Sequence, residues 1–144
     1  MRTHTRRHGR DDAGFTLIEL LVVMIIIGIL AAIAIPIFLN QRATAHDAST
    51  KADVNTLGKE VATYFVDGTG ATSLSLTALP GHVVITDGVN STTVRLTNGS
   101  AAPSAGGYAN LNDPYNWCVS LSDPQGKLKD FRYSAKAGLE AGIC

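Results

Sequence analysis

The chain has 144 residues, which is enough for one domain and short for two. Its 12 basic and 12 acidic residues balance, but the first fourteen residues hold four arginines and two aspartates, so the remainder carries 8 basic against 10 acidic side chains. A net charge of about −2 beyond residue 14 argues against a general polyanion-binding protein. The basic tip is typical of an orientation signal for a membrane segment.

Residues 15–39 are almost wholly apolar, and the 20 residues from Leu20 to Leu39 carry no charge. As a helix this stretch would extend about 30 Å, at about 1.5 Å per residue, which matches one bilayer core. Because the arginines precede it, the positive-inside rule predicts a single-pass membrane protein with a cytoplasmic N-terminus. The rest of the chain would then lie outside the cytosol.

The polar segment 40–66 is expected to continue the same helix. Its apolar residues recur at helical spacing and its charged residues fall on the other positions, which predicts an amphipathic half. The apolar set is Val54, Leu57, Val61 and Phe65, and the charged set is Lys51, Asp53, Lys59 and Glu60. Gly68 and Gly70 should end a helix of about 50 residues, whose apolar stripe needs a covering layer.

Residues 67–144 are rich in Gly, Ser, Thr and Asn and contain short alternating runs. We expect four antiparallel strands, at 82–86, 92–97, 116–121 and 129–134, paired as two hairpins across turn-like segments. Their apolar faces would cover the helix. The predicted fold is therefore α+β: a long N-terminal hydrophobic helix packed on a small antiparallel β-sheet, with 98–114 as a long loop.

The junction between the basic tip and the apolar run reads GFTLIE, from Gly14 to Glu19. It resembles the prepilin-type cleavage and methylation signal of type IV pilins: a short basic leader, a glycine, a phenylalanine, and an apolar helix with glutamate at its fifth position. The resemblance is close over residues 9–40. It extends loosely to the whole chain through the long helix, the small sheet and the C-terminal cysteines.

The resemblance implies a role for each residue of the junction. Gly14 would be the last leader residue, and a prepilin peptidase would cut after it and N-methylate Phe15. Glu19 would guide docking into the filament. The stretch from Gly28 to Pro36 would lose helical order in the assembled filament, and Pro36 does remove one backbone donor from the helix.

The family plan divides the chain into a leader (1–14), a transmembrane and polymerisation helix (15–39), the amphipathic half of that helix (40–66) and a globular β-sheet domain (67–144). The implied product is a structural pilin of a type IV pilus-like surface filament. Its partners would be other copies of itself, the prepilin peptidase, the inner-membrane assembly machinery and, before assembly, membrane lipid. No cofactor, metal or specific nucleic acid is predicted.

The chain has two cysteines, Cys118 and Cys144. An even number in an exported domain favours a disulfide, and two cysteines allow a single pairing. If Trp117, Val119 and Leu121 face the helix, Cys118 points to the outer side or the edge of the sheet. A bridge there would hold down a C-terminal segment that otherwise has little apolar content.

Several alternatives remain open at this level. The N-terminus could be an ordinary signal peptide cut near Ala32 and Ala34, which would release a secreted binding domain, or a plain membrane anchor. A pseudopilin of a type II secretion or DNA-uptake machine would have the same design. Major pseudopilins often bind calcium through acidic residues of a C-terminal loop, for which residues 110–124 offer only Asp113 and Asp123.

Two further features have simple explanations. The basic run Lys127, Lys129, Arg132 and Lys136 could bind DNA or a neighbouring subunit, but it is interrupted by Asp130 and is typical of a solvated strand face. Neither His46 nor His82 belongs to a metal or catalytic motif, and the cysteines are too far apart for a redox pair. The sequence therefore predicts a protein that is not an enzyme.

Overall fold

The structure is a computed structural model, and it describes residues 14–66, 74–97, 99–102 and 107–144. These residues form one helix, α1 (Leu17–Val66), and seven β-strands. The leader up to residue 13 and the predicted helix stop at Gly68 and Gly70 lie outside the described residues. The chain divides into two compact units, residues 1–37 and 38–144.

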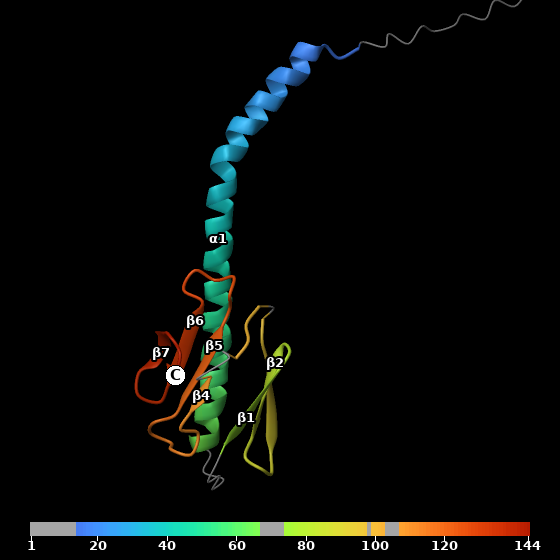
Figure 1. The fold of residues 1–144 in the computed structure, drawn as a ribbon. Coiled ribbons are helices and arrows are strands. Elements are labelled where there is room, and N and C mark those ends of the chain that lie inside the picture. Colours follow the sequence, from blue (N-terminus) through green and yellow to red (C-terminus); the bar gives the residue numbers. More distant parts are fainter. Residues whose placement is uncertain (1–13, 67–73, 98, 103–106) are drawn as a thin grey trace, which may run out of the picture. The chain divides into compact units, whose positions relative to one another are not determined.

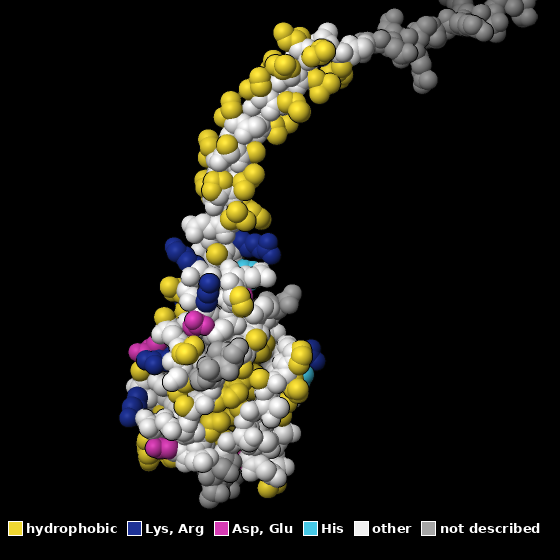
Figure 2. All heavy atoms as spheres, viewed as in Figure 1, with side chains coloured by type: hydrophobic (Ala, Val, Ile, Leu, Met, Phe, Trp, Pro, Cys, Tyr) yellow, Lys and Arg dark blue, Asp and Glu magenta, His cyan; other side chains and the backbone are white. Residues whose placement is uncertain are grey.

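The first unit contains the N-terminal half of α1, and its apolar side chains are open to the surroundings. From Leu17 to Ile37 the large apolar side chains are between 46% and 84% exposed, and Figure 2 shows them along this half of the helix. By length and composition α1 could cross a bilayer. A helix that is apolar all round and uncovered requires lipid or other subunits around it.

Gly28 and Pro36 do not interrupt α1, which is helical from Leu17 to Val66. The predicted loss of helical order between them concerns the assembled filament, so it stays a prediction. A side chain added at Gly28 would meet no atom within 4 Å, so the fold of the subunit does not itself require glycine there.

The second unit packs the C-terminal half of α1 against two antiparallel sheets (Figure 1). The first sheet has the order β1 (Ser75–Leu79), β2 (His82–Thr86), β3 (Ser91–Arg95). The second has the order β4 (Tyr108–Ala109), β5 (Cys118–Ser122), β6 (Asp130–Ser134), β7 (Gly138–Ala141). The α+β fold class is confirmed, but two sheets replace the single one predicted.

The predicted hairpins are both present. β2 pairs with β3 in the register Val83↔Val94, and β5 pairs with β6 in the register Leu121↔Phe131. All four of these side chains are buried. They meet the fully buried stripe of α1, which consists of Val54, Leu57 and Val61.

The described residues form seven strands, so the predicted number of four was too low. β1, β4 and β7 went unrecognised because an edge strand or a two-residue strand has little of the alternation that identifies a half-buried strand. The predicted loop 98–114 contains β4 and an isolated bridge between Ala101 and Ser122. The chain in this region is therefore partly paired to β5.

Trp117 lies between two other aromatic rings in the core. Its ring centroid is 6.2 Å from that of Phe65 on α1 and 5.9 Å from that of Tyr133 on β6, and both pairs are stacked. Tyr133 in turn lies directly on Gly58 of α1, where an added Cβ would overlap the ring. The absence of a side chain at Gly58 thus allows the second sheet to approach the helix.

Candidate processing and assembly site

The start of α1 is closed by reciprocal hydrogen bonds between Thr16 and Glu19. The Thr16 backbone N–H and hydroxyl donate to Glu19 Oε2 at 3.0 and 2.7 Å. In return the Glu19 N–H donates to Thr16 Oγ1 at 3.3 Å. This is a capping box, in which Thr16 is the N-cap residue and Glu19 the third helical residue.

The capping box gives Glu19 a local role that the sequence analysis missed. The signal was present, since Thr-x-x-Glu before an apolar run is a pattern of helix starts. Both bonds from Thr16 reach the same carboxylate oxygen, and Glu19 Oε1 has no partner among residues 14–66 and the other described segments. One carboxylate oxygen is therefore oriented by the helix start and the other is open.

The junction before the helix is open. Gly14 is exposed, and a Cβ added to it would meet nothing within 4 Å. Its φ is not among the positive values of the chain, so neither space nor backbone conformation requires glycine there. Phe15 is 81% exposed and precedes the first helical residue.

Cys118 and Cys144 form a disulfide, with their Cα atoms 5.9 Å apart, as predicted. The C-terminal segment is also held in two ways that the sequence did not indicate. β7 pairs with β6, and Arg132 donates to the Ile143 carbonyl at 3.3 Å and to Glu140 at 2.9 Å. The disulfide thus closes a segment that lies on the outer side of the second sheet.

These bonds also give a structural role to Arg132, which belongs to the basic run of Lys127, Lys129, Arg132 and Lys136. Arg132 is engaged by Glu140 on the neighbouring strand. Lys127 and Lys129 belong instead to the turn between β5 and β6. The run is therefore divided between a turn and a sheet.

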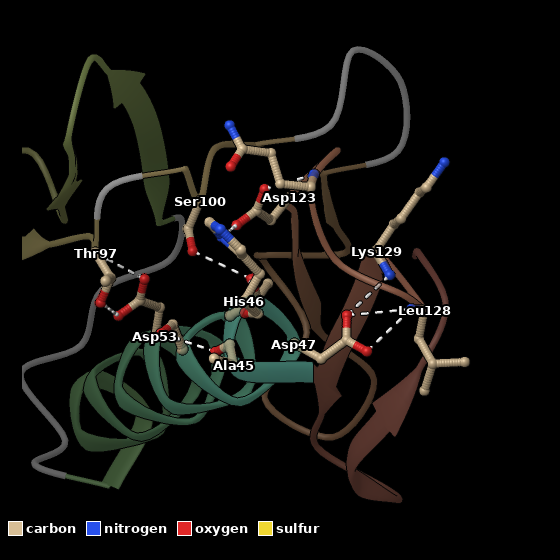
Figure 3. A network of polar contacts seen from close by, with 12 residues as sticks. Ala45, His46, Asp47, Asp53, Thr97, Ser100, Asp123, Leu128 and Lys129 are labelled. Carbon is tan, nitrogen blue, oxygen red and sulfur yellow. Dashed lines mark hydrogen bonds and ion pairs between the residues drawn. The ribbon is translucent and has the colours of Figure 1, made fainter. Parts of the chain in front are cut away.

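A group of buried and half-buried polar residues on α1 holds two distant parts of the chain, the segment around Thr97 and Ser100 and the turn between β5 and β6, as Figure 3 shows. We call it the polar seam; it consists of His46, Asp47, Thr50 and Asp53. Asp47 accepts hydrogen bonds from the backbone N–H of Leu128 at 3.0 Å and of Lys129 at 3.3 Å. A Cβ on Gly126 would overlap the Asp47 carboxylate.

The other members of the seam act in the same way. Asp53 accepts from the Thr97 N–H at 2.7 Å and its hydroxyl at 2.9 Å. His46 Nδ1 lies 2.7 Å from Asp123 Oδ2. Asp53 was expected among the charged residues that fall outside the apolar stripe of the helix, yet it is 8% exposed. Two sheets cover more of the helix than one would, and the buried carboxylate is satisfied by chain segments from the covering layer.

Comparison with known proteins finds a family motif and several relatives. Residues 9–35 match the prokaryotic N-terminal methylation motif. The chain is 37% identical over 99 residues to the type IV wide pilus major component PilA4 of Thermus thermophilus, covering 69% of this chain and 71% of that protein.

Two other relatives belong, by their names, to other machines. The chain is 34% identical over 94 residues to competence protein ComGC of Halalkalibacterium halodurans, covering 65% of this chain and 92% of that protein. It is 36% identical over 58 residues to type II secretion system core protein G of Pseudomonas aeruginosa, covering 40% and 41%. No solved structure matches the chain.

The helix with its N-terminal signal, the small antiparallel sheets and these relatives define a class of filament-forming subunits. The chain belongs to the family of type IV pilins and pseudopilins, which carry a prepilin-type cleavage and methylation signal. Members of this family are structural proteins and not enzymes. Membership implies processing by prepilin peptidase, a membrane stage and polymerisation.

Proposed function

We propose that the chain is the precursor of a pilin that forms a type IV pilus-like surface filament. Residues 1–14 are removed as a leader, residues 15–39 span the membrane and later form the filament interior, and residues 40–66 carry the β-sheet domain 67–144. The observation that carries this proposal is the open Gly14–Phe15 junction directly before a capped, uncovered apolar helix.

The open junction supports cleavage after Gly14. Since the fold gives no reason for glycine at this position, the requirement comes from outside the subunit. A protease that approaches the backbone closely is such a requirement. With the N-terminus on the cytoplasmic side, cleavage and methylation would take place there.

Glu19 acts in assembly by pairing with the amine of a neighbouring Phe15. It is the single ionisable residue between Phe15 and Leu39, and an ion in an apolar layer costs a few kcal/mol unless it is paired. The amine exists only after cleavage, and methylation keeps its charge. At about 4 Å and an effective dielectric of about 20, the pair contributes roughly 4 kcal/mol before desolvation is subtracted. The open Oε1 atom is available for this contact.

The second candidate is a pseudopilin of a type II secretion or DNA-uptake machine. It is favoured by the relatives ComGC and core protein G. Two observations support the pilin instead. Asp123 is buried against His46, and Asp113 accepts the Tyr115 N–H at 2.9 Å, so both carboxylates expected for a calcium loop serve internal contacts.

Mass spectrometry of the mature protein tests the processing step. We expect an N-terminus at Phe15 with one added methyl group. A matched pair of variants extends the test: Gly14→Val should block cleavage, whereas Gly28→Val, which lies within α1 and has equally open space around it, should not. A mature protein that starts near Ile35, or an intact leader, would contradict the proposal.

Glu19→Ala tests the assembly step. Membrane insertion should persist, because the segment stays apolar, while sheared surface filaments should disappear. Electron microscopy of cells with and without the gene then separates a pilus from a pseudopilus. Normal filaments built from Glu19→Ala subunits would exclude the pairing with the Phe15 amine, and the absence of surface filaments from cells that process the wild-type protein would favour the pseudopilin.

A further inference from the structure

A groove of about 340 Å³ lies between α1 and the turn that joins β5 to β6. One wall is a single face of the helix, formed by Leu39, Arg42, Ala43 and His46 at helical spacing. The other wall is Gln125 of the turn. We call this hollow the Arg42 groove; it lies wholly within the second unit.

The turn that forms the outer wall is fixed to the helix. Asp47 accepts from the backbone of Leu128 at 3.0 Å, and His46 Nδ1 contacts Asp123 at 2.7 Å. The Gln125 N–H donates to the other oxygen of Asp123 at 2.9 Å. The groove is therefore preorganised, because its shape does not depend on a free loop closing over a ligand.

The polar groups that line the groove suit an anion. The Arg42 guanidinium and the Gln125 side-chain amide have no hydrogen-bond partner among the described residues. His46 Nδ1 is taken up by Asp123 at 2.7 Å, so the side-chain donors open to a ligand in the groove are the Arg42 guanidinium and the Gln125 amide. A guanidinium next to further polar side chains is a usual arrangement for binding phosphate.

The neighbouring carboxylates do not fill this role themselves. Asp47 and Asp123 are 6% and 1% exposed, and both are occupied by hydrogen bonds from the turn and from His46. Arg42 forms no ion pair with a carboxylate anywhere in the residues that the structure describes. Its charge is therefore available to a ligand from outside the subunit.

The position of the groove indicates where such a phosphate would come from. Arg42 follows the last residue of the apolar run, Leu39, by one helical turn. On the same turn as Gln125, Leu128 is 56% exposed between the exposed Lys127 and Lys129. An apolar side chain flanked by cations is suited to the boundary between lipid chains and headgroups.

We propose that the Arg42 groove binds the phosphate of a phospholipid headgroup while the subunit is in the membrane. The proposal rests on the membrane stage of the proposed function. Leu128 lies beside the bound headgroup, at the boundary between the headgroups and the acyl chains. The contact would hold the β-sheet domain at the bilayer surface and would be given up when the subunit leaves for the filament.

The test uses the full chain in maltoside micelles, which contain no phosphate. Short-chain phosphatidylglycerol is titrated in, and the side-chain amide of Gln125 is followed by NMR. We expect the chemical shift of this amide to change until it saturates. The apparent affinity for the lipid should fall about tenfold in Arg42→Gln, because one charge-assisted contact is lost. The matched control Lys59→Gln removes an exposed charge from the same helix, away from the groove, and should change the affinity less than about twofold.

A second variant and a second probe identify the source of the phosphate. Leu128→Ser should weaken binding of the lipid and leave binding of inorganic phosphate unchanged. Equal affinities for lipid and inorganic phosphate would overturn the lipid assignment. The proposed site would be excluded if the Gln125 signal showed no saturable shift, or if Arg42→Gln and Lys59→Gln lost equal amounts of affinity for the lipid. Carbonate extraction of the same proteins from membranes measures insertion separately. A protein that inserts normally but does not bind the lipid in the groove would contradict the groove proposal and not the proposed function.

Discussion

Replacing Gly58 by alanine sets two effects of opposite sign against each other. In the middle of a helix, alanine is favoured over glycine by about 1 kcal/mol, because glycine loses more backbone entropy on folding. Against this, the added methyl group would overlap Tyr133 at Cβ, Cγ and Cδ1, which are the root of its side chain and not its flexible end. The sign of the change depends on whether Tyr133 can move.

The structure gives Tyr133 little room to move. Its ring stacks on Trp117 at 5.9 Å, and Trp117 stacks on Phe65 of the same helix at 6.2 Å. Overpacking by one methyl group costs about 1–3 kcal/mol, and a displaced aromatic pair costs about 0.5–1.5 kcal/mol more. After the helix gain of about 1 kcal/mol is subtracted, Gly58→Ala should lower the free energy of unfolding by about 2 kcal/mol.

Urea unfolding of the detergent-solubilised protein measures this change. The single tryptophan of the chain, Trp117, is 3% exposed and lies in the affected stack, so its fluorescence reports on the packing directly. Gly28→Ala is the matched control, because the same substitution on the same helix meets open space. In a Tyr133→Ala background, Gly58→Ala should instead stabilise by up to about 1 kcal/mol. A higher urea midpoint for Gly58→Ala in the wild-type background would refute the reasoning.

Three other predictions concern the β-sheet domain. Cys144→Ser should lower its stability by about 3.5 kcal/mol on the chain-entropy model, given the 26-residue separation of the cysteines; equal urea midpoints for the oxidised and reduced wild-type protein would contradict this. The buried Tyr108 hydroxyl has no partner among the described residues, so Tyr108→Phe should stabilise by about 1 kcal/mol. Burial also raises the pKa of Tyr108 above 10.0. The free energy of unfolding of the wild type should therefore fall as the pH rises beyond that value, and the loss that comes from Tyr108 should be missing in Tyr108→Phe. The backbone N–H groups of Asn90 and Val89 lower the pKa of Asp87. The contribution of ionised Asp87 to the free energy of unfolding is therefore present above pH 3.8 and is lost as the pH falls through the pKa of Asp87 in the folded protein. Asp87→Ala should be less stable than the wild type at neutral pH and equally stable in strong acid.

Features set by neighbours along the chain could be predicted from the sequence. The helix was expected to continue through the polar segment 40–66, and α1 is helical from Leu17 to Val66, because its apolar spacing is a local property. The hairpin around Asp87 was expected from its turn residues, and Asp87 does accept the N–H of Val89 at 2.8 Å. The capping box at Thr16 and Glu19 is also a feature set by neighbours along the chain, because its complete pattern is four residues long.

Features set by what covers an element could not be predicted in this way. Asp53 and Lys59 were assigned to the same charged face, yet Asp53 is 8% exposed and Lys59 is exposed. The difference comes from the segment around Thr97, which reaches the helix at Asp53. No property of the helix sequence alone says how far around its circumference a second sheet extends.

The sequence by itself determined the class of the protein, because the cleavage signal, the apolar span and the single cysteine pair are each recognisable without tertiary contacts. Only the tertiary structure decided that the strands divide into two sheets and that edge strands such as β7 exist. It also decided that Asp47 and His46 shape the Arg42 groove. An edge strand takes its structure from the partner beside it, and a buried carboxylate depends on distant backbone N–H groups, so both depend on residues far away in the chain.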